Sequence, residues 1–330
     1  MATDPLPDLT DFPYPGYDIL VPIRDVATGL TGYWKAKGYQ SVRPSRWSGH
    51  NFPEITRQKE MAISPQFEVA YPFREGVALV RQGNYWGAID PRGDFRIAPK
   101  FAQLGGDDFR GFSEGTVPAF DGQQWGFIDT SGQWTIPPRF AQALGFSEGI
   151  ARVQEVDRTG WSTINQKGEL IARTNCEIIG PYREGLAPAL SPKDGWHYLN
   201  PQGKKQLPRK GTLFSRSRGY ESAMAFSQGW GLIQTAPQKY QFINPQGQML
   251  PEGPFSLAHS FSQGRASVQK NGQWRYLDQR GNPTDGHLYT YASSYFRLRG
   301  QTMARVQKSD GQSEFIDLNG DPVNLNELLP

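Results

Sequence analysis

The feature that most constrains this chain is an internal repeat of about 35 residues. A short segment of the form aromatic-x-x-Gly begins each copy, and successive copies start 34 to 44 residues apart. The copies are FREG (73–76), FSEG (112–115), FSEG (146–149), YREG (182–185), FSQG (226–229), FSQG (261–264) and the looser FRLRG (296–300). A repeat of this length indicates one small supersecondary element stacked on its neighbours, so we expect an array and not a single globular core.

A second marker, of the form Asp/Asn-x-x-Gly, follows in every copy after 17 to 21 residues. Asp or Asn first and Gly fourth are the preferences of a type I turn followed by a residue with positive φ. The pattern assigns to turns Asp90 and Gly93, Asp129 and Gly132, Asn165 and Gly168, Asn200 and Gly203, Asn244 and Gly247, Asp278 and Gly281, and Asp317 and Gly320. A general acid or a calcium ligand would lose its charge where Asp becomes Asn, so a structural role is favoured here. The same reasoning holds for the third residue of the first marker, which is Glu in the first four copies, as at Glu75, and Gln in the next two, as Gln228 and Gln263.

Period-2 alternation predicts strands on both sides of the turn. The residues four and two places before the turn Asp or Asn are mostly aromatic, and we expect them to form the core in preference to stacking on sugar rings. The residue between them changes from copy to copy, as Gly87, Gly126, Ser162, His197, Gln241, Arg275 and Glu314, which predicts a polar or bare outer face. A short third segment containing proline, such as FRIAPKF (95–101), predicts an edge strand.

The expected fold class is therefore all-β, with tandem β-hairpin repeats stacked as a curved, solenoid-like array. A closed β-propeller is the alternative, and about three short strands per repeat argue against its four-stranded blades. The expected organisation is a proline-rich capping segment or degenerate repeat (1–61), seven repeats (62–323) and a C-terminal tail (324–330).

Composition limits the classes of partner. Lys and Arg number 35 against 32 Asp and Glu, for a net charge of +3, which does not favour binding of nucleic acid through overall charge. The single cysteine, Cys176, is expected to be a buried small hydrophobic residue in a reducing compartment. No stretch approaches the length of about 18 apolar residues that a membrane helix needs, so we expect a soluble, cytoplasmic protein.

At these residues the sequence resembles the WG-repeat proteins of bacteria. The segment FSEGTVPAFDGQQWGFIDTSGQWTIPPRF (112–140) resembles their pattern at nearly every position, and the resemblance covers about 62–323. Later copies depart from it, because Trp-Gly becomes Trp-Ser at 161, Trp-His at 196, Tyr-Gln at 240 and Trp-Arg at 274. The resemblance implies a role in interaction and no shared catalytic residue.

Two surfaces are candidates for binding another protein. The first is the varied strand position, with His197, Gln241 and Arg275 as its polar members. The second is a basic insertion within 204–219, which would suit an acidic or anionic partner and carries Lys204, Lys205, Arg209, Lys210, Arg216 and Arg218. An acidic pair, Asp107 and Asp108, is interpreted as a solvated loop and not as a cation site.

The sequence thus predicts a non-enzymatic scaffold for protein–protein interaction. A glycan-binding, lectin-like module is one alternative, and a hydrolase whose site is assembled between repeats is another. The four histidines lack metal-site spacing, and no cofactor-binding motif is present, so the sequence predicts neither a metal nor a cofactor.

Overall fold

The computed structural model describes residues 20–25, 27–35, 44–45, 52–53, 60–105, 111–207, 219–298 and 300–324. Within these ranges every regular element is a β-strand, and there is no helix that could cross a membrane. The chain divides into two compact parts, whose described residues are essentially 20–146, called here the N-terminal half, and 147–323, called the C-terminal half. Each half is described by itself.

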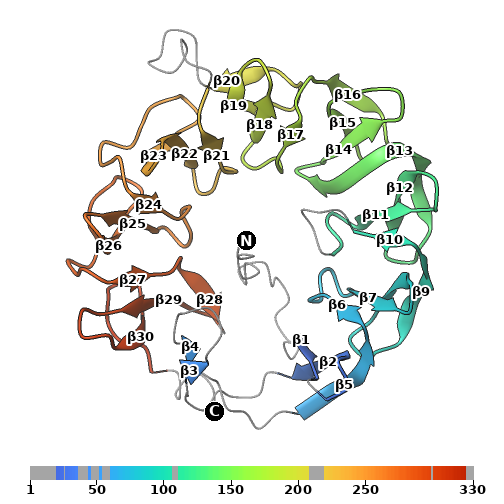
Figure 1. Cartoon of the computed structure of the whole chain (residues 1–330), viewed down its shortest axis with the longest axis horizontal. Helices are drawn as coiled ribbons and strands as arrows, with labels where there is room; N and C mark the ends of the chain where they lie inside the picture. The colour runs from blue at the N-terminus through green and yellow to red at the C-terminus, as the bar shows by residue number, and fades with distance from the viewer. Residues whose placement is uncertain are drawn as a thin grey trace. The chain divides into compact units, whose positions relative to one another are not determined.

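The N-terminal half contains three sheets of antiparallel strands and a short hairpin (Figure 1). The first sheet is β1 (Leu20–Arg24), β2 (Thr31–Lys35) and β5 (Glu60–Phe67), and the hairpin is β3 (Pro44–Ser45) with β4 (Phe52–Pro53). The second sheet is β6 (Val69–Ala70), β7 (Ala78–Gln82), β8 (Tyr85–Ile89) and β9 (Phe95–Phe101). The third is β10 (Gln103–Leu104), β11 (Thr116–Phe120), β12 (Trp125–Asp129) and β13 (Trp134–Ser147), whose last residue begins the C-terminal half.

The C-terminal half repeats the same arrangement. Its strands are β14 (Ile150–Glu155), β15 (Ser162–Asn165) and β16 (Leu170–Arg173), then β17 (Ile178–Ile179), β18 (Ala187–Ser191), β19 (Gly195–Leu199) and β20 (Lys205–Leu207). They continue with β21 (Ser222–Ala223), β22 (Gly231–Ala236) and β23 (Lys239–Ile243), and with β24 (Leu257–Ala258), β25 (Ala266–Lys270) and β26 (Gln273–Leu277). The last sheet holds β27 (Tyr291–Ala292), β28 (Phe296–Leu298), β29 (Gln301–Gln307) and β30 (Ser313–Ile316).

These sheets confirm an all-β array of tandem hairpin repeats, but some repeats have four strands and not three, as in β6–β9 and β17–β20. A two-residue strand such as β6 precedes the aromatic-x-x-Gly segment and pairs with the first strand of the hairpin, as in Val69 with Arg81. Two residues are too few to show a period, which is why the sequence pattern missed this strand. In later repeats the outer strand is reduced to isolated bridges, such as Ile243 with Met249 and Tyr240 with Phe255.

The described strands within residues 20–67 have the pairing of a repeat, called here the first repeat. Gly32 and Tyr33 of β2 stand where the later repeats have Gly126 and Phe127, and β5 pairs with β2 as its outer strand. The strand β5 crosses the expected boundary between residues 61 and 62. The division into a capping segment, seven repeats and a tail stays a prediction.

The core lies where the alternation predicts it. The aromatic residue two places before the turn is fully buried in four repeats, as Phe127, Tyr198, Phe242 and Tyr276. The turn glycines have positive φ in all seven repeats, and Asp90 Oδ1 accepts hydrogen bonds from the backbone N–H groups of Arg92 and Asp94. Asn244 Oδ1 accepts the same two bonds in its own repeat, so Asp and Asn can both occupy this corner of the turn.

The aromatic-x-x-Gly segment joins each repeat to the next. Its third residue, Glu or Gln, has φ between 52° and 55°, which is costly for a residue with a side chain. That side chain accepts a hydrogen bond from the glycine N–H of the following repeat. The Gly115 N–H donates to Glu75 Oε2 at 2.8 Å, and the Gly264 N–H donates to Gln228 Oε1 at 2.8 Å. An oxygen acceptor suffices for this bond, which explains why Glu and Gln are exchanged here.

The second residue of the segment adds a parallel link where it is serine. Ser113 Oγ donates to the carbonyl of Phe146 at 2.8 Å, and Ser262 Oγ donates to that of Tyr295 at 2.7 Å. Phe146 is the first residue of the following segment, and Tyr295 is the aromatic residue directly before the last segment. The Phe-Ser-Glu-Gly motif thus forms a turn and also links its repeat to the next one by hydrogen bonds.

Candidate interaction surface

In the repeats that have glycine at the varied position of the central strand, this position faces the outer strand and not open solvent. The outer strand bulges there, so that the seven residues 134–140 lie opposite the four residues 125–128, between the pairs Ile128–Trp134 and Trp125–Phe140. A Cβ added at Gly126 would lie 2.5 Å from the carbonyl oxygen of Ile136, and one at Gly87 would meet the carbonyl of Ile97. Glycine at this position therefore lets the outer strand close onto the central strand.

In other repeats a side chain occupies this place, and it is buried. His197 is 3% exposed and Gln241 is 8% exposed. Gln241 Nε2 donates to the carbonyl of Leu250 in the outer segment at 2.7 Å, and His197 Nδ1 lies 2.8 Å from the carbonyl of Gly195. The structure thus buries His197 and Gln241, which were expected on an outer polar face, and binding of a partner through them stays a prediction.

Arg275 and Glu314 are partly exposed and already have ionic partners. Arg275 Nη2 lies 2.5 Å from Glu252 Oε1, and its side chain is 25% exposed. Lys308 Nζ lies 2.7 Å from Glu314 Oε1. A partner that used Arg275 would have to replace the pairing with Glu252, so binding through Arg275 stays a prediction.

The basic insertion is described only at its start. Lys204 is exposed, and its backbone N–H donates to Asn200 Oδ1 at 2.9 Å, within the turn. Lys205 Nζ lies 3.2 Å from Asp194 Oδ1. The other predicted members, Arg209, Lys210, Arg216 and Arg218, lie outside the described residues, as do Asp107 and Asp108.

The buried cysteine lies beside a buried histidine. Cys176 is 4% exposed, as predicted, and its Sγ is 3.9 Å from His197 Nε2. Burial raises the pKa of the Cys176 thiol and lowers the pKa of His197, so both groups are held neutral. A thiolate nucleophile requires the opposite shift of the thiol pKa, so this pair is part of the core.

Among the described residues, no group of three or more His, Cys, Asp or Glu side chains is placed to hold a metal ion. His259 Nδ1 lies 2.7 Å from Ser267 Oγ, and its ring stacks on Trp274 with centroids 5.0 Å apart. Ser267 is 1% exposed, so a substrate cannot reach its hydroxyl in this conformation.

A row of exposed apolar side chains was not predicted. Five of the large hydrophobic residues that the structure exposes share one repeat position, the second residue after the turn glycine or its equivalent in the first repeat. This outer row consists of Met61 (46% exposed), Phe95 (41%), Trp134 (37%), Leu170 (44%) and Met249 (37%). Lys205 occupies the same position in its repeat and is also exposed.

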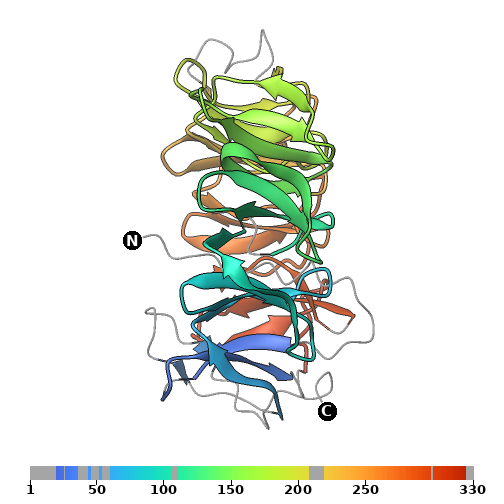
Figure 2. The same ribbon diagram turned by 90° about the vertical axis from the view of Figure 1, so that its right-hand side faces the viewer.

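Phe95, Trp134 and Leu170 begin the outer strands β9, β13 and β16, and β9 and β13 face the viewer in Figure 2. Phe95 contacts Phe67 of the preceding sheet edge-on, with ring centroids 6.2 Å apart, and Trp134 contacts Phe101 in the same way at 5.7 Å. The inner parts of Phe95 and Trp134 thus fill boundaries between sheets, and their outer parts face solvent. Aligning the repeats on the turn glycine would have revealed the row, since the residues after the turn are apolar in most copies.

Comparison with solved structures finds low-identity likenesses. BamB from Moraxella catarrhalis is 13% identical, with a TM-score of 0.42, over 90% of this chain and 92% of that chain. AztD from Citrobacter koseri is 11% identical with a TM-score of 0.41 over 93% of each chain. The C-terminal WD40 domain of Sif2 is 10% identical with a TM-score of 0.40, over 91% of this chain and 99% of that chain. No curated protein matches the sequence.

The family profile described as "WG containing repeat" matches residues 55–86, 125–156, 161–190 and 242–274. Two of these matches begin at Trp125, the first residue of β12, and at Trp161, the residue before β15. The matches fall in both halves. The matched segments of this chain are WG repeats, and the chain is similar to WG-repeat proteins.

Proposed function

We propose that the protein is a non-enzymatic scaffold that binds another protein through the members of the exposed outer row that lie in its N-terminal half, Met61, Phe95 and Trp134. The observation that carries this proposal is the placement of five exposed apolar side chains at one repeat position. Scattered apolar residues are normal on a surface, but a set that recurs at one position is typical of an interaction site.

The row suits a binding role because its backbone is held by the repeat frame. Each row residue follows the turn glycine, and the outer strand that it begins pairs with the central strand, as Phe95 does with Ile89. Rigid aromatic side chains such as Phe95 and Trp134 lose little conformational freedom on binding and supply much of the energy in protein interfaces.

Quantitative affinity capture from the source cell tests the proposal. A Phe95→Ser, Trp134→Ser variant should lose at least about tenfold in capture of a defined partner, because two central apolar contacts are removed. The matched control is Leu170→Ser with Met249→Ser, which removes similar exposed area from the C-terminal half. Equal capture by both double variants and by the wild type would contradict the proposal, provided that all three unfold cooperatively at similar temperatures.

The basic insertion remains a second proposed contact. Charge reversal at Lys204, Lys205, Arg209 and Lys210 should weaken capture, and the loss should shrink at high salt because exposed charges are screened. Capture unchanged at low salt would remove the insertion from the proposal.

A glycan-binding role is favoured by one observation, the exposure of two aromatic rings, Phe95 and Trp134. Such rings stack on the apolar faces of sugars. A glycan array should then give a signal that Trp134→Ser abolishes, and an array at background would exclude this second candidate.

A further inference from the structure

We infer that the partner segment bound by the N-terminal half is an extended, acidic stretch of protein that also carries apolar side chains. This inference rests on the proposed function and adds the chemistry of the partner. The surface concerned, called here the outer-strand patch, consists of Phe95, Arg96, Lys100, Trp134 and Arg139.

The patch combines cations with aromatic rings. The outer segments 95–101 and 134–140 contain Arg96, Lys100 and Arg139 and no Asp or Glu. The Arg96 side chain is 64% exposed, and its Nε lies 3.5 Å from Asp90 Oδ2. A solvent-exposed pair at this distance contributes little and leaves the guanidinium able to meet another carboxylate.

The other two cations lie over the aromatic residues at the ends of the outer segments. Lys100 Nζ is 5.2 Å from the centroid of the Phe101 ring, and the Arg139 guanidinium is 5.0 Å from that of Phe140. Phe101 in turn packs against Trp134. A carboxylate that meets Lys100 would therefore bring its neighbouring apolar side chain to the exposed ring of Trp134.

The outer segments of the C-terminal half have a different charge. Arg173 Nη2 is paired with Glu155 Oε2 at 2.7 Å, and Lys205 is paired with Asp194. The later outer segments 249–255 and 283–289 contain Glu252 and Asp285 and no Lys or Arg. Among the outer segments that the structure describes, the largest excess of cations therefore lies in the N-terminal half, apart from the basic insertion 204–219.

An extended segment fits the direction of the patch. The end of β9 meets the beginning of β13 through the Phe101–Trp134 contact, so the two outer strands follow one another. Pro99 and Pro138 have no N–H to donate, which disfavours simple addition of a strand at this edge. The patch must then recognise the side chains of the partner segment, through their charge and the spacing of the apolar residues.

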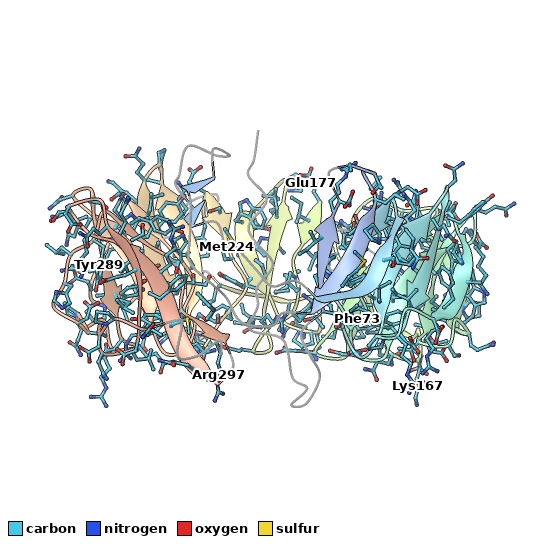
Figure 3. The ribbon with its side chains drawn as sticks, turned by 90° about the horizontal axis from the view of Figure 1, so that it is seen from below. Phe73, Lys167, Glu177, Met224, Tyr289 and Arg297 are labelled. Atoms are coloured by element: carbon cyan, nitrogen blue, oxygen red, sulfur yellow. The ribbon has the colours of Figure 1, made fainter. Side chains whose placement is uncertain are left out.

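Selection from a phage-displayed library of random peptides of about 12 residues, which reach about 40 Å when extended, tests the inference. We expect the enriched peptides to combine Asp or Glu with apolar residues. Their affinity should fall about tenfold or more for Lys100→Glu with Arg139→Glu. The control is Lys167→Glu with Lys239→Glu, which makes the same change in net charge and should leave affinity within about twofold. Both control lysines are exposed in the C-terminal half, and Figure 3 shows Lys167 pointing away from the ribbon.

Three outcomes would overturn the inference. Enriched peptides that depend on Trp134 but are basic or uncharged would exclude an acidic partner and leave the proposed function standing. Equal loss of affinity in the patch and control charge variants would show a nonspecific charge effect. Tight binding of an oligothymidylate that depends on Lys100 and Arg139, without enrichment of acidic peptides, would show a nucleic-acid surface. Enriched peptides that bind the Phe95→Ser, Trp134→Ser protein as tightly as the wild type would count against the proposed function itself.

Discussion

The repeats of the N-terminal half and those of the C-terminal half share one register and differ at one strand position. Gly32, Gly87 and Gly126 lie under the carbonyl of an Ile-x-Pro segment, and the outer strands β5 and β9 are continuous over eight and seven residues. In the C-terminal half the position holds Ser, His, Gln, Arg or Glu, and outer pairing becomes shorter or reduced to bridges. The difference shows that a single side chain on the central strand controls how closely the outer strand can approach.

This difference also affects the surface. Continuous outer strands hold Phe95 and Trp134 at defined positions beside Arg96 and Lys100. In the C-terminal half none of the corresponding residues is aromatic, and Arg173 is paired with Glu155 within its repeat. We therefore expect substitutions to have different consequences in the two halves.

The largest effect is expected for Gly87→Val. Its Cβ would meet the Ile97 carbonyl and lie 2.9 Å from Pro99 N, so the outer strand must move away. We expect a loss of about 3 kcal/mol or more in the free energy of unfolding, measured by urea denaturation. Gln241→Ala in the C-terminal half should cost only about 1–2 kcal/mol, because it removes one hydrogen bond to Leu250 O. Equal losses of unfolding free energy in Gly87→Val and Gln241→Ala would contradict the difference between the two halves.

A second prediction concerns a position at which the two halves should agree. Gly93 has φ of 93° and Gly168 has φ of 79°, and valine is strained at either place. Each Gly→Val substitution should destabilise by about 2 kcal/mol, whereas Asp90→Asn should be nearly neutral because Asn occupies the same corner in three repeats. Thermal unfolding measures these effects, and a Gly93→Val protein as stable as the wild type would contradict the turn assignment.

A smaller effect is expected at the link between repeats. Glu75→Ala removes the acceptor for the Gly115 N–H and should cost about 1 kcal/mol in chemical denaturation. Glu75→Gln should stay within about 0.5 kcal/mol, because Gln228 makes the same bond to Gly264. If both substitutions cost the same, the bond does not stabilise the array.

The smallest expected effect is a pH dependence of stability that arises from an ion pair in the C-terminal half. The hydrogen bond from Arg173, together with one from Ser162, lowers the pKa of Glu155 to about 2. Because the pKa is lower in the folded state, the charged carboxylate stabilises the protein above its unfolded pKa, and this contribution is lost as pH falls from about 4.5 toward 2. Glu155→Gln should flatten the acid dependence of unfolding in this window, and an unchanged acid dependence would exclude a stabilising role for the pair.

The repeat frame could be predicted from the sequence because its signals are local. The turn at Asp90 and Gly93 and the buried aromatics such as Phe127 follow from turn preferences and period-2 alternation. The short first strands could not be predicted, since two residues carry no period. The outer aromatic residues Tyr220, Phe255 and Tyr289 were also missed. Tyr220 and Phe255 each lie six residues before an aromatic-x-x-Gly segment, and Tyr289 lies six residues before Tyr295.

The site was harder to predict than the frame. Alternation places His197 and Gln241 opposite the core aromatics, which suggests solvent, but both side chains are buried. Gln241, for example, donates to the carbonyl of Leu250 in the outer segment, a tertiary contact that the pattern of one strand does not contain. The outer row was missed because its residues, such as Phe95 and Trp134, were interpreted only as parts of an edge strand.

Hydrogen–deuterium exchange of the protein with and without its captured partner tests the central claim, that the outer row of the N-terminal half is the binding surface. The account predicts slower exchange in the peptides that cover 95–101 and 134–140 and little change in 170–173 and 249–255. Protection confined to the C-terminal half, or to the region of residues 204–219, would contradict it.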